Sequence, residues 1–252
     1  MADLDSKRQR LLDLLASYGS CGVAFSAGVD STVLAKAAQL ALGDAAVAVT
    51  GVSASLAEGE AQAARQLAEQ IGIRHVVIQT GELERAEYVR NESDRCFHCK
   101  NELYTQMEGL AERLEVAVLV NGANVDDLSD YRPGMQAAAE HRVQSPMAEC
   151  GLTKQEVRQL AAEWQLPVWN KPATPCLSSR IAYGEQVTPE RLAMIDRAEK
   201  YLRGLGLITV RVRYHKGDLA RVEVPPEAIA RLCAEPIRTE LAAKFKALGF
   251  RF

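Results

Sequence analysis

A short stretch of small and polar residues, Ser26 to Ser31, has the composition of a phosphate-binding loop. It reads Ser-Ala-Gly-Val-Asp-Ser and lies between the apolar run 23–25 and a helical pattern of apolar residues. In a turn from a buried strand to a helix, backbone N–H groups and serine hydroxyls face outward, and the helix dipole adds to their attraction for an anion. The loop lacks the lysine of G-x-x-x-x-G-K-[ST] loops, which favours pyrophosphate as its ligand. We expect Gly28 to relieve crowding in the turn and Ser31 or Thr32 to open the helix.

Three of the six cysteines lie in polar surroundings where a thiol could react or bind a metal. Cys96 and Cys99 form a C-x-x-C pair ahead of a predicted helix, and Cys176 lies in the segment Pro175-Cys176-Leu177-Ser178-Ser179-Arg180. The remaining three lie in apolar settings and are predicted to be core residues: Cys21, Cys150 and Cys233.

Four interpretations of the polar cysteines are open. A zinc site would need a fourth ligand, and His98 lies between the paired cysteines, where simultaneous ligation is strained. A thioredoxin-type redox pair would leave Cys176 without a role. A [4Fe-4S] cluster held by three thiolates would leave one iron open to a small ligand such as sulfide. The pair is incidental in the fourth interpretation, since C-x-x-C alone is only moderately specific.

The elements that must position these residues indicate an α/β fold. Short apolar runs without polar alternation, at 23–25, 46–50, 75–79 and 117–121, are typical of strands covered on both faces. Helical spacing marks 6–16, 57–70, 100–114 and 153–164, the last opened by a Thr-Lys-Gln-Glu capping box. This alternation predicts a doubly wound parallel sheet that binds ligands beyond the carboxyl ends of its strands. Ser53 and Gly122 follow two of these strands and are candidates for contacting adenine and ribose.

A second, smaller α+β domain is predicted after the proline-rich segment 166–175. We place the boundary near Tyr183, which gives domains of residues 1–183 and 184–252. The second domain begins with a helix from Thr188 to Leu205, continues with strands 209–215 and 219–224, and ends with two further helices. Arg211 and Arg213 alternate onto one face of its first strand, where they form either a phosphate site or a solvated charged face.

Composition restricts the function classes. The chain has 252 residues and a formal net charge of −3, and its pI near 5.9 argues against a globally basic nucleic-acid binder. No apolar run approaches the ~18 residues needed to span a membrane, and the N-terminus lacks a signal-peptide core. The cysteines are too few for a disulfide framework. We therefore predict a cytoplasmic protein with neither membrane nor nucleic acid as partner.

The phosphate loop resembles the S-G-G-x-D-S loop of the PP-loop ATP pyrophosphatases, whose sheet is of the adenine nucleotide alpha hydrolase-like kind. Ala27 replaces the first glycine, a change that matters only if this position requires a positive φ. Together with Cys96-x-x-Cys99, Asn121-Gly122-x-Asn124 and the segment 175–181, the loop makes the chain similar to the LarE family over almost its whole length. LarE proteins are ATP-dependent sulfur transferases that make the pincer cofactor of nickel enzymes such as lactate racemase.

The resemblance implies a reaction. A carboxylate of pyridinium-3,5-biscarboxylic acid mononucleotide is adenylylated with ATP and Mg²⁺, and sulfur then displaces AMP to give a thiocarboxylate. In one kind of LarE protein, the cysteine matching Cys176 surrenders its own sulfur and becomes dehydroalanine. In the other kind, three cysteines bind a [4Fe-4S] cluster whose open iron carries sulfide from a donor. With Cys96 and Cys99 as well as Cys176, this chain resembles the second kind. The resemblance also implies homo-oligomers, as trimers or hexamers.

The resemblance also assigns residues to roles. Asp30 would position Mg²⁺ or pyrophosphate, and Asp30 and Cys176 are the predicted catalytic residues. Predicted to bind nucleotide are Ser26, Ala27, Gly28, Val29, Asp30, Ser31, Ser53 and Gly122. The predicted substrate-binding residues are Ser179, Arg180, Arg211 and Arg213, and the predicted cluster ligands are Cys96, Cys99 and Cys176. No role is assigned to Asp126, Asp127, Asp218 or Glu223.

Three other functions compete with sulfur transfer to a mononucleotide. A PP-loop tRNA thiolase can also hold three cysteines, but the acidic pI and the lack of a basic RNA-binding extension weigh against it. A nucleotide-binding or zinc-stabilised regulatory module would bind ATP without turnover, so ATP-dependent pyrophosphate release would exclude it. An amidotransferase-type ligase such as NAD synthetase shares the loop but gives the cysteines no role.

Overall fold

The computed structural model describes residues 2–129 and 133–252. The chain divides into two compact units: unit 1 comprises Met1–Ser53, Gly59–Glu82 and Cys96–Thr174, and unit 2 comprises Ala54–Glu58, Leu83–Arg95 and Pro175–Phe252. The sequence predicted two contiguous domains, 1–183 and 184–252, and did not anticipate that two short segments before residue 96 join unit 2. Local patterns identify helices and strands, but they do not reveal on which unit a connecting segment packs.

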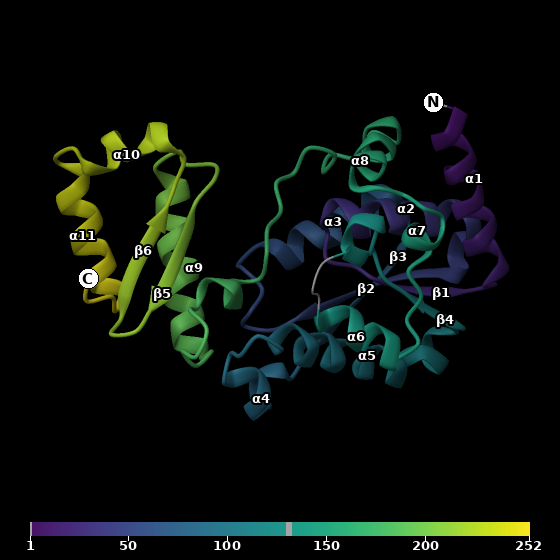
Figure 1. Cartoon of the computed structure of the whole chain (residues 1–252), viewed down its shortest axis with the longest axis horizontal. Helices are drawn as coiled ribbons and strands as arrows, with labels where there is room; N and C mark the ends of the chain where they lie inside the picture. Colours follow the sequence, from purple (N-terminus) through teal and green to yellow (C-terminus); the bar gives the residue numbers. More distant parts are fainter. Residues whose placement is uncertain (1, 130–132) are drawn as a thin grey trace. The chain divides into compact units, whose positions relative to one another are not determined.

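Unit 1 contains a parallel sheet with helices on both faces (Figure 1). Its helices and strands are α1 (Ala2–Ser17), β1 (Cys21–Ala24), α2 (Val29–Leu42), β2 (Ala46–Val52), α3 (Glu60–Ile71), β3 (Arg74–Gln79), α5 (Arg95–Leu114, from Cys96 onward), β4 (Val118–Val120), α6 (Pro133–Glu140), α7 (Pro146–Glu149) and α8 (Lys154–Glu163). The strand order is β3-β2-β1-β4, and Val23 in β1 lies opposite Ala48 in β2 and Val120 in β4. The predicted α/β fold with a doubly wound parallel sheet is confirmed.

Two apolar layers bury the sheet. Helices α1, α2, α3 and α8 cover one face through side chains such as Leu15, Leu34 and Leu160 (Figure 1). Helix α5 covers the other face through Tyr104 and Met107, and α6 covers it through Ala137 and Ala138. Strand β1 is buried along its whole length. A strand with neighbours on both edges and helices on both faces has no solvent side, which explains why its sequence shows no polar alternation. In the described part of the chain, no helix is both long and apolar enough to cross a membrane.

Unit 2 contains a two-stranded antiparallel sheet and several helices. Its elements are α4 (Ala86–Val89), a 3-10 helix (Leu177–Arg180), α9 (Pro189–Gly204), β5 (Arg211–His215), β6 (Leu219–Glu223), α10 (Pro226–Cys233) and α11 (Ile237–Leu248). Along β5, Val212 and Tyr214 are buried, whereas Arg211 and Arg213 are only partly covered. The segment after the 3-10 helix runs beside β5, where Ala182 N–H donates to Tyr214 O at 3.0 Å.

Two helices begin earlier than the sequence predicted. Helix α2 begins at Val29 with Gly28 as its N-cap, and not at Ser31 or Thr32. The hydroxyls of Ser31 and Thr32 donate to the Gly28 carbonyl at 3.2 and 2.7 Å inside the first turn, so they do not cap the helix amides. Helix α5 begins at Arg95, so the cysteine pair lies in its first turn and not ahead of it.

Gly122 marks the point where the loop after β4 touches the start of α2. A Cβ atom at this position would lie 2.9 Å from the backbone nitrogen of Ser31 and 3.1 Å from the carbonyl carbon of Asp30. Backbone atoms of a packed helix cannot turn aside as the end of a side chain can. The close approach of these two segments therefore requires glycine.

We predict that Gly122→Ala lowers the free energy of unfolding by about 1–3 kcal/mol, the usual cost of overpacking. Gly109→Ala in α5 is the matched control, because an added Cβ there meets nothing within 4 Å. Alanine at that helical position should raise stability by up to ~1 kcal/mol. Urea unfolding followed by circular dichroism measures both changes. Wild-type stability of Gly122→Ala would show that α2 shifts freely.

Candidate active site

The loop from Ser26 to Ser31 joins the carboxyl end of β1 to α2. Phe25 N–H donates to Val49 O at 2.8 Å, so pairing with β2 extends to the edge of the loop. Ser26 N–H donates to Ser31 Oγ at 3.2 Å, and the two hydroxyl oxygens also lie 3.2 Å apart. The amides from Val29 to Ser31 open a helix and have no helical carbonyl to bind. Together with the hydroxyls they have the geometry of an anion cradle.

The loop has its left-handed residue at Ala27, not at Gly28. Ala27 has φ 55°, whereas Gly28 has φ −81°, which any residue can adopt. The alanine thus occupies a position that does require positive φ, at a cost of about 1–2 kcal/mol for an L-residue. Its methyl group is buried, which offsets about 0.8 kcal/mol of that strain.

Asp30, in the first turn of α2, is held by two side chains from distant parts of unit 1. Asn124 Nδ2 donates to Asp30 Oδ1 at 3.2 Å, and the Lys154 ammonium forms an ion pair with Oδ2. The loop has no cation of its own, and its contact with Lys154 was not predicted, because no local spacing relates residues 124 positions apart. Lys154 brings a positive charge to the side chain next to the phosphate loop.

The loop after β4 positions both partners of Asp30. Asp126 Oδ2 accepts from the backbone N–H of Lys154 at 2.8 Å, and Asp127 Oδ2 accepts from Asn124 N–H at 3.0 Å. The Asn124 side-chain oxygen accepts from Asp126 N–H, also at 3.0 Å. Asp126 and Asp127, to which the sequence assigned no role, therefore orient the residues that contact Asp30.

The other predicted nucleotide-binding residues lie at the same edge of the sheet. Ser53 directly follows β2, and its hydroxyl donates to the buried carboxylate of Glu82. Gly122 follows β4 and touches the first turn of α2. Because β1, β2 and β4 are parallel, their carboxyl ends gather these loops at one edge of unit 1.

Cys176 lies in unit 2, in a turn whose backbone is hydrogen-bonded while its side chain is exposed. We call residues 175–181 the Cys176 turn. Leu177 N–H donates to Ser55 O at 2.9 Å, and Ser179 N–H donates to Cys176 O at 3.0 Å. The Ser179 hydroxyl donates to the same carbonyl at 2.7 Å. The thiol therefore projects to solvent from a fixed backbone.

Arg213 connects the Cys176 turn to the exposed face of β5. Its Nε pairs with Glu223 Oε1 at 2.6 Å, and its Nη1 donates to Ser179 O at 3.2 Å. Arg221 binds the same Glu223 oxygen at 2.9 Å. Hydrogen bonds from Arg213, and then from Arg221, hold the pKa of Glu223 below its usual range. Within residues 2–129 and 133–252, the Arg211 guanidinium has no ion-pair partner, so it is available to an anion.

Arg180 and Asp218 pair with other residues. Arg180 is buried, and its guanidinium pairs with Glu199 at 3.0 Å. Its predicted contact with substrate is not tested by this geometry and stays a prediction. Asp218 accepts from the Tyr214 hydroxyl at 2.6 Å and pairs with Arg251 at 3.1 Å, which secures the turn between β5 and β6.

The predicted cluster ligands belong to different units. Cys96 is exposed and Cys99 is half-buried in the first turn of α5, and their spacing of three residues puts both thiols on one helix face. This pair belongs to unit 1 and Cys176 to unit 2. Among the residues that the structure describes, there is no group of three or more His, Cys, Asp or Glu side chains that could hold a metal ion.

The three cysteines predicted to be buried do not all lie in the core. Cys21 and Cys150 are buried, as predicted, but Cys233 is exposed, so that prediction was wrong. Helix α10 turns Ala228 and Leu232 inward. Cys233 follows Leu232 by one residue, a rotation of about 100° around the helix, which carries it off the buried face.

Comparison with known proteins identifies the family. Residues 13–95, which include the phosphate loop, match the asparagine synthase family. The chain is 35% identical to the pyridinium-3,5-bisthiocarboxylic acid mononucleotide synthase of Lactiplantibacillus plantarum, over 100% of its own length and 91% of that protein's. The chain belongs to the LarE family of these synthases. It is an ATP-dependent sulfurtransferase, as its motifs predicted.

Two further relatives are uncharacterised proteins. An uncharacterised protein of Synechocystis sp. is 45% identical over 99% of this chain and 92% of its own length. An uncharacterised protein of Methanocaldococcus jannaschii is 29% identical over 65% of this chain and 62% of its own length. The similarity to the first of these covers both units.

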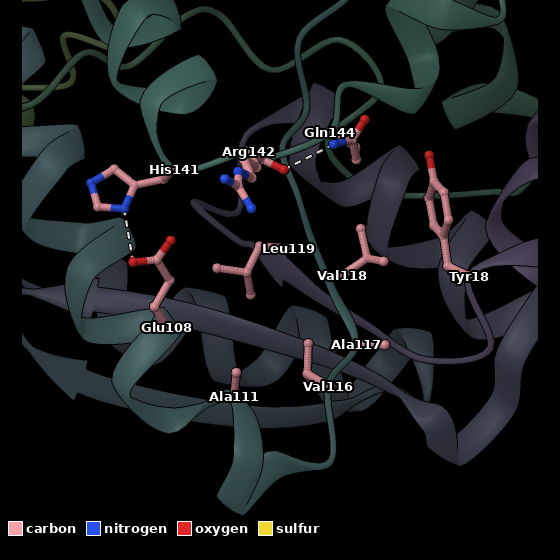
Figure 2. Close-up of a pocket in the computed structure, with 10 residues that line it drawn as sticks. All are labelled: Tyr18, Glu108, Ala111, Val116, Ala117, Val118, Leu119, His141, Arg142 and Gln144. Atoms are coloured by element: carbon pink, nitrogen blue, oxygen red, sulfur yellow. Dashed lines mark hydrogen bonds and ion pairs between the residues drawn. The ribbon is translucent and has the colours of Figure 1, made fainter.

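A hollow of about 380 Å³ lies along β4 in unit 1 (Figure 2). Apolar side chains such as Val116 and Leu119 line it, and at one side His141 Nδ1 lies 2.9 Å from the Glu108 carboxylate. Val116 and Ala117 precede β4, whereas the phosphate loop follows the parallel strand β1. The hollow therefore lies toward the amino ends of the strands, away from the family's phosphate loop.

Thiol labelling of the metal-free protein tests the assignment of the cysteines. Burial raises the pKa of Cys21 to about 12 and also raises that of Cys150. Both stay protonated and unreactive at mildly alkaline pH, where we predict that iodoacetamide labels Cys96, Cys176 and Cys233. Peptide mass spectrometry should find Cys21 and Cys150 labelled only after unfolding in urea. Rapid labelling of Cys21 in the native protein would contradict the packing of β1.

Proposed function

We propose that the protein adenylylates a carboxylate of pyridinium-3,5-biscarboxylic acid mononucleotide and replaces the AMP by sulfur, giving a thiocarboxylate for a nickel-pincer cofactor. The observation that carries this proposal is the similarity to the L. plantarum synthase, which spans the whole chain. The two halves of the reaction suit the two sets of residues described above. The phosphate loop of unit 1 serves adenylylation, and the Cys176 turn of unit 2 serves sulfur transfer. The reaction takes place in the cytoplasm.

The first step activates an unreactive group. A substrate carboxylate oxygen attacks the α-phosphorus of ATP, the bond from that phosphorus to the bridging oxygen breaks, and pyrophosphate leaves with the electron pair. The amides of Val29 to Ser31 and the Ser26 hydroxyl stabilise the negative charge of the departing pyrophosphate. Lys154 lies close enough to Asp30 to add a positive charge there.

Mg²⁺ fits the acidic side of this site. Carboxylate oxygen is a preferred ligand of Mg²⁺, and Asp30 presents one beside the phosphate loop. When bound there, Mg²⁺ would neutralise phosphate charge. Asn124 would hold the Asp30 carboxylate in place through its existing hydrogen bond.

The second step replaces oxygen by sulfur. A sulfur nucleophile attacks the acyl carbon, the carbon–oxygen bond to AMP breaks, and AMP leaves with the electron pair. Arg211 and Arg213 hold the phosphate of the mononucleotide, since side chains two residues apart on a strand project to the same side. Ser179 adds a hydroxyl beside Arg213, whose Nη1 already contacts the Ser179 carbonyl.

We further propose that Cys96, Cys99 and Cys176 bind a [4Fe-4S] cluster. Thiolates are the usual ligands of such clusters, and a cluster held by three of them supplies, when bound, an open iron for sulfide. The paired thiols on one face of α5 and the exposed thiol of Cys176 are suited to this role.

The alternative is that Cys176 gives up its own sulfur. Its thiolate would attack the acyl carbon and release AMP. The Cβ–Sγ bond would then break as a base removes the α-proton. That route would leave dehydroalanine at position 176 and allow each chain a single turnover.

Substitution of Asp30 tests the adenylylation step. We predict that Asp30→Ala abolishes the formation of AMP and pyrophosphate, because it removes the carboxylate that orients Lys154 and would bind Mg²⁺. The Asp30 side chain is 28% exposed, so stability should fall by no more than about 1 kcal/mol. Asp44→Ala, at an exposed position just after α2, is the matched control. Chromatography of the nucleotides gives the answer, and ADP as the wild-type product would refute adenylylation.

Mass spectrometry tests the source of the sulfur. After anaerobic reconstitution and turnover with excess sulfide, we predict that the mass of the polypeptide is unchanged. Changing Cys96, Cys99 or Cys176 to Ser should remove the brown colour and stop sulfur transfer while pyrophosphate release continues. Cys233→Ser, which removes another exposed thiol, should keep both colour and transfer. Stoichiometric dehydroalanine at position 176 would instead establish the sacrificial route.

A further inference from the structure

Arg180 binds the backbone of the Cys176 turn. Its Nη1 donates to the carbonyl oxygens of Pro175 and Cys176, the second at 3.1 Å, and to Ser179 Oγ at 3.0 Å. The same Ser179 hydroxyl donates to Cys176 O at 2.7 Å. One guanidinium nitrogen thus gathers two successive carbonyls and a hydroxyl around the cysteine. The Arg180 side chain does so while only 4% exposed.

Glu199 in α9 fixes the other side of Arg180. Its Oε1 accepts from Arg180 Nε at 3.0 Å and from Val212 N–H at 3.1 Å, while its Oε2 pairs with Arg203 at 2.7 Å. The Glu199 side chain is 0% exposed. A buried carboxylate with every oxygen bonded tolerates little movement, because any displacement would leave a charge without a partner. Arg180 is therefore held by Glu199, which lies in α9 and is bound in turn by the backbone of β5. Both elements belong to unit 2, as does the Cys176 turn.

We propose that Arg180 is a positioning residue for sulfur transfer. Held by Glu199, it fixes the Pro175 and Cys176 carbonyls and so sets the direction of the Cys176 thiol. Two other arginines hold later carbonyls of the turn: Arg95 donates to Ser178 O at 2.8 Å and Arg213 to Ser179 O at 3.2 Å. Arg180 differs from both because it binds the carbonyl of the cysteine itself.

The proposal rests on the proposed function for the reaction that it serves, and it holds for either source of sulfur. An exposed thiol that follows an extended, proline-rich segment needs a restraint if it is to meet one acyl carbon. Misplacing a reacting group by about 1 Å can cost about 100-fold in rate. A contact with the substrate phosphate, in contrast, would require an accessible guanidinium and would act mainly on substrate affinity.

Steady-state kinetics separate these two roles. We expect Arg180→Gln to lower kcat for thiocarboxylate formation by about 10–100-fold, with little change in KM for the mononucleotide. Pyrophosphate release should persist, and Arg180→Lys should recover part of kcat because an ammonium can still bind one carbonyl. Arg211→Ala provides the opposite signature, a raised KM. Arg231→Gln is the matched control, since it removes an arginine of unit 2 whose guanidinium donates to Leu205 O, outside the Cys176 turn.

Hydrogen–deuterium exchange tests the positioning without any catalysis. The amides of Leu177, Ser179 and Ile181 are hydrogen-bonded in the Cys176 turn. We expect peptides covering residues 175–181 to exchange faster in Arg180→Gln and in Arg180→Lys, and at the wild-type rate in Arg231→Gln. If the glutamine variant does not fold, the lysine variant carries the test.

The outcomes are distinguishable. Unchanged exchange with a raised KM would overturn the positioning role and return Arg180 to the substrate phosphate. Unchanged exchange with unchanged kinetics would also overturn it. Faster exchange in a protein whose wild type forms no thiocarboxylate would support the restraint on the turn and refute the proposed function.

Discussion

Parallel pairing of β1 with the strands on both sides is the constraint on which the nucleotide site depends. It places the carboxyl ends of β1, β2 and β4 at one edge of unit 1, where a strand-to-helix loop can present unbonded amides. The loop after β4 reaches the first turn of α2 only because residue 122 has no side chain. Close packing of backbone on backbone therefore sets the position of the phosphate loop before any ligand is bound.

The charge at this edge comes from outside the loop. The loop itself offers hydroxyls, amides and Asp30, whereas the cation comes from Lys154 at the start of α8. The side chains of this ion pair are 28% and 37% exposed, so it contributes at most about 1 kcal/mol to stability. Asp127 and Asp126 nevertheless hold Asn124 and Lys154, the two partners of Asp30, in position. Such an arrangement stabilises the fold very little, which favours a role in binding phosphate and metal.

The parts of the fold that follow from local sequence were predictable. Strands covered on both faces lack polar alternation, Thr153 and Glu156 form the predicted capping box, and the hairpin of unit 2 follows from its alternating pattern. The start of α2 was not predictable, because the hydroxyls of Ser31 and Thr32 bind a carbonyl when they could equally have capped amides.

The candidate site was predictable where its residues are contiguous and not where distant segments meet. The phosphate loop is recognisable from six residues, and the Cys176 turn from a short segment. No local pattern predicts the contact of Lys154 with Asp30. The sequence indicates only that Lys154 begins a helix in the same domain. The ion pair of Arg180 with Glu199 joins residues of two separate helices, which no local pattern relates.

The Cys176 turn reconciles two opposed requirements, an accessible thiol and a fixed direction. Guanidinium groups hold the backbone carbonyls, and carboxylates balance their charge, Glu199 for Arg180 and Glu223 for Arg213. The two carboxylates differ in exposure, since the side chain of Glu199 is 0% exposed and that of Glu223 is 34% exposed. In the proposed reaction, the phosphate of the substrate therefore competes with Glu223 and not with Glu199.

Arg213 also holds the carbonyl of Ser179, so an anion that draws it from Glu223 acts on a residue already bound to the turn. In the proposed reaction, the phosphate of the substrate and the position of the sulfur are thus connected through one side chain. Arg180 keeps its buried partner throughout and holds the cysteine carbonyl while that exchange takes place. Arg213 can thus exchange its partner while Arg180 cannot, because the Glu223 carboxylate is partly exposed and the Glu199 carboxylate is buried.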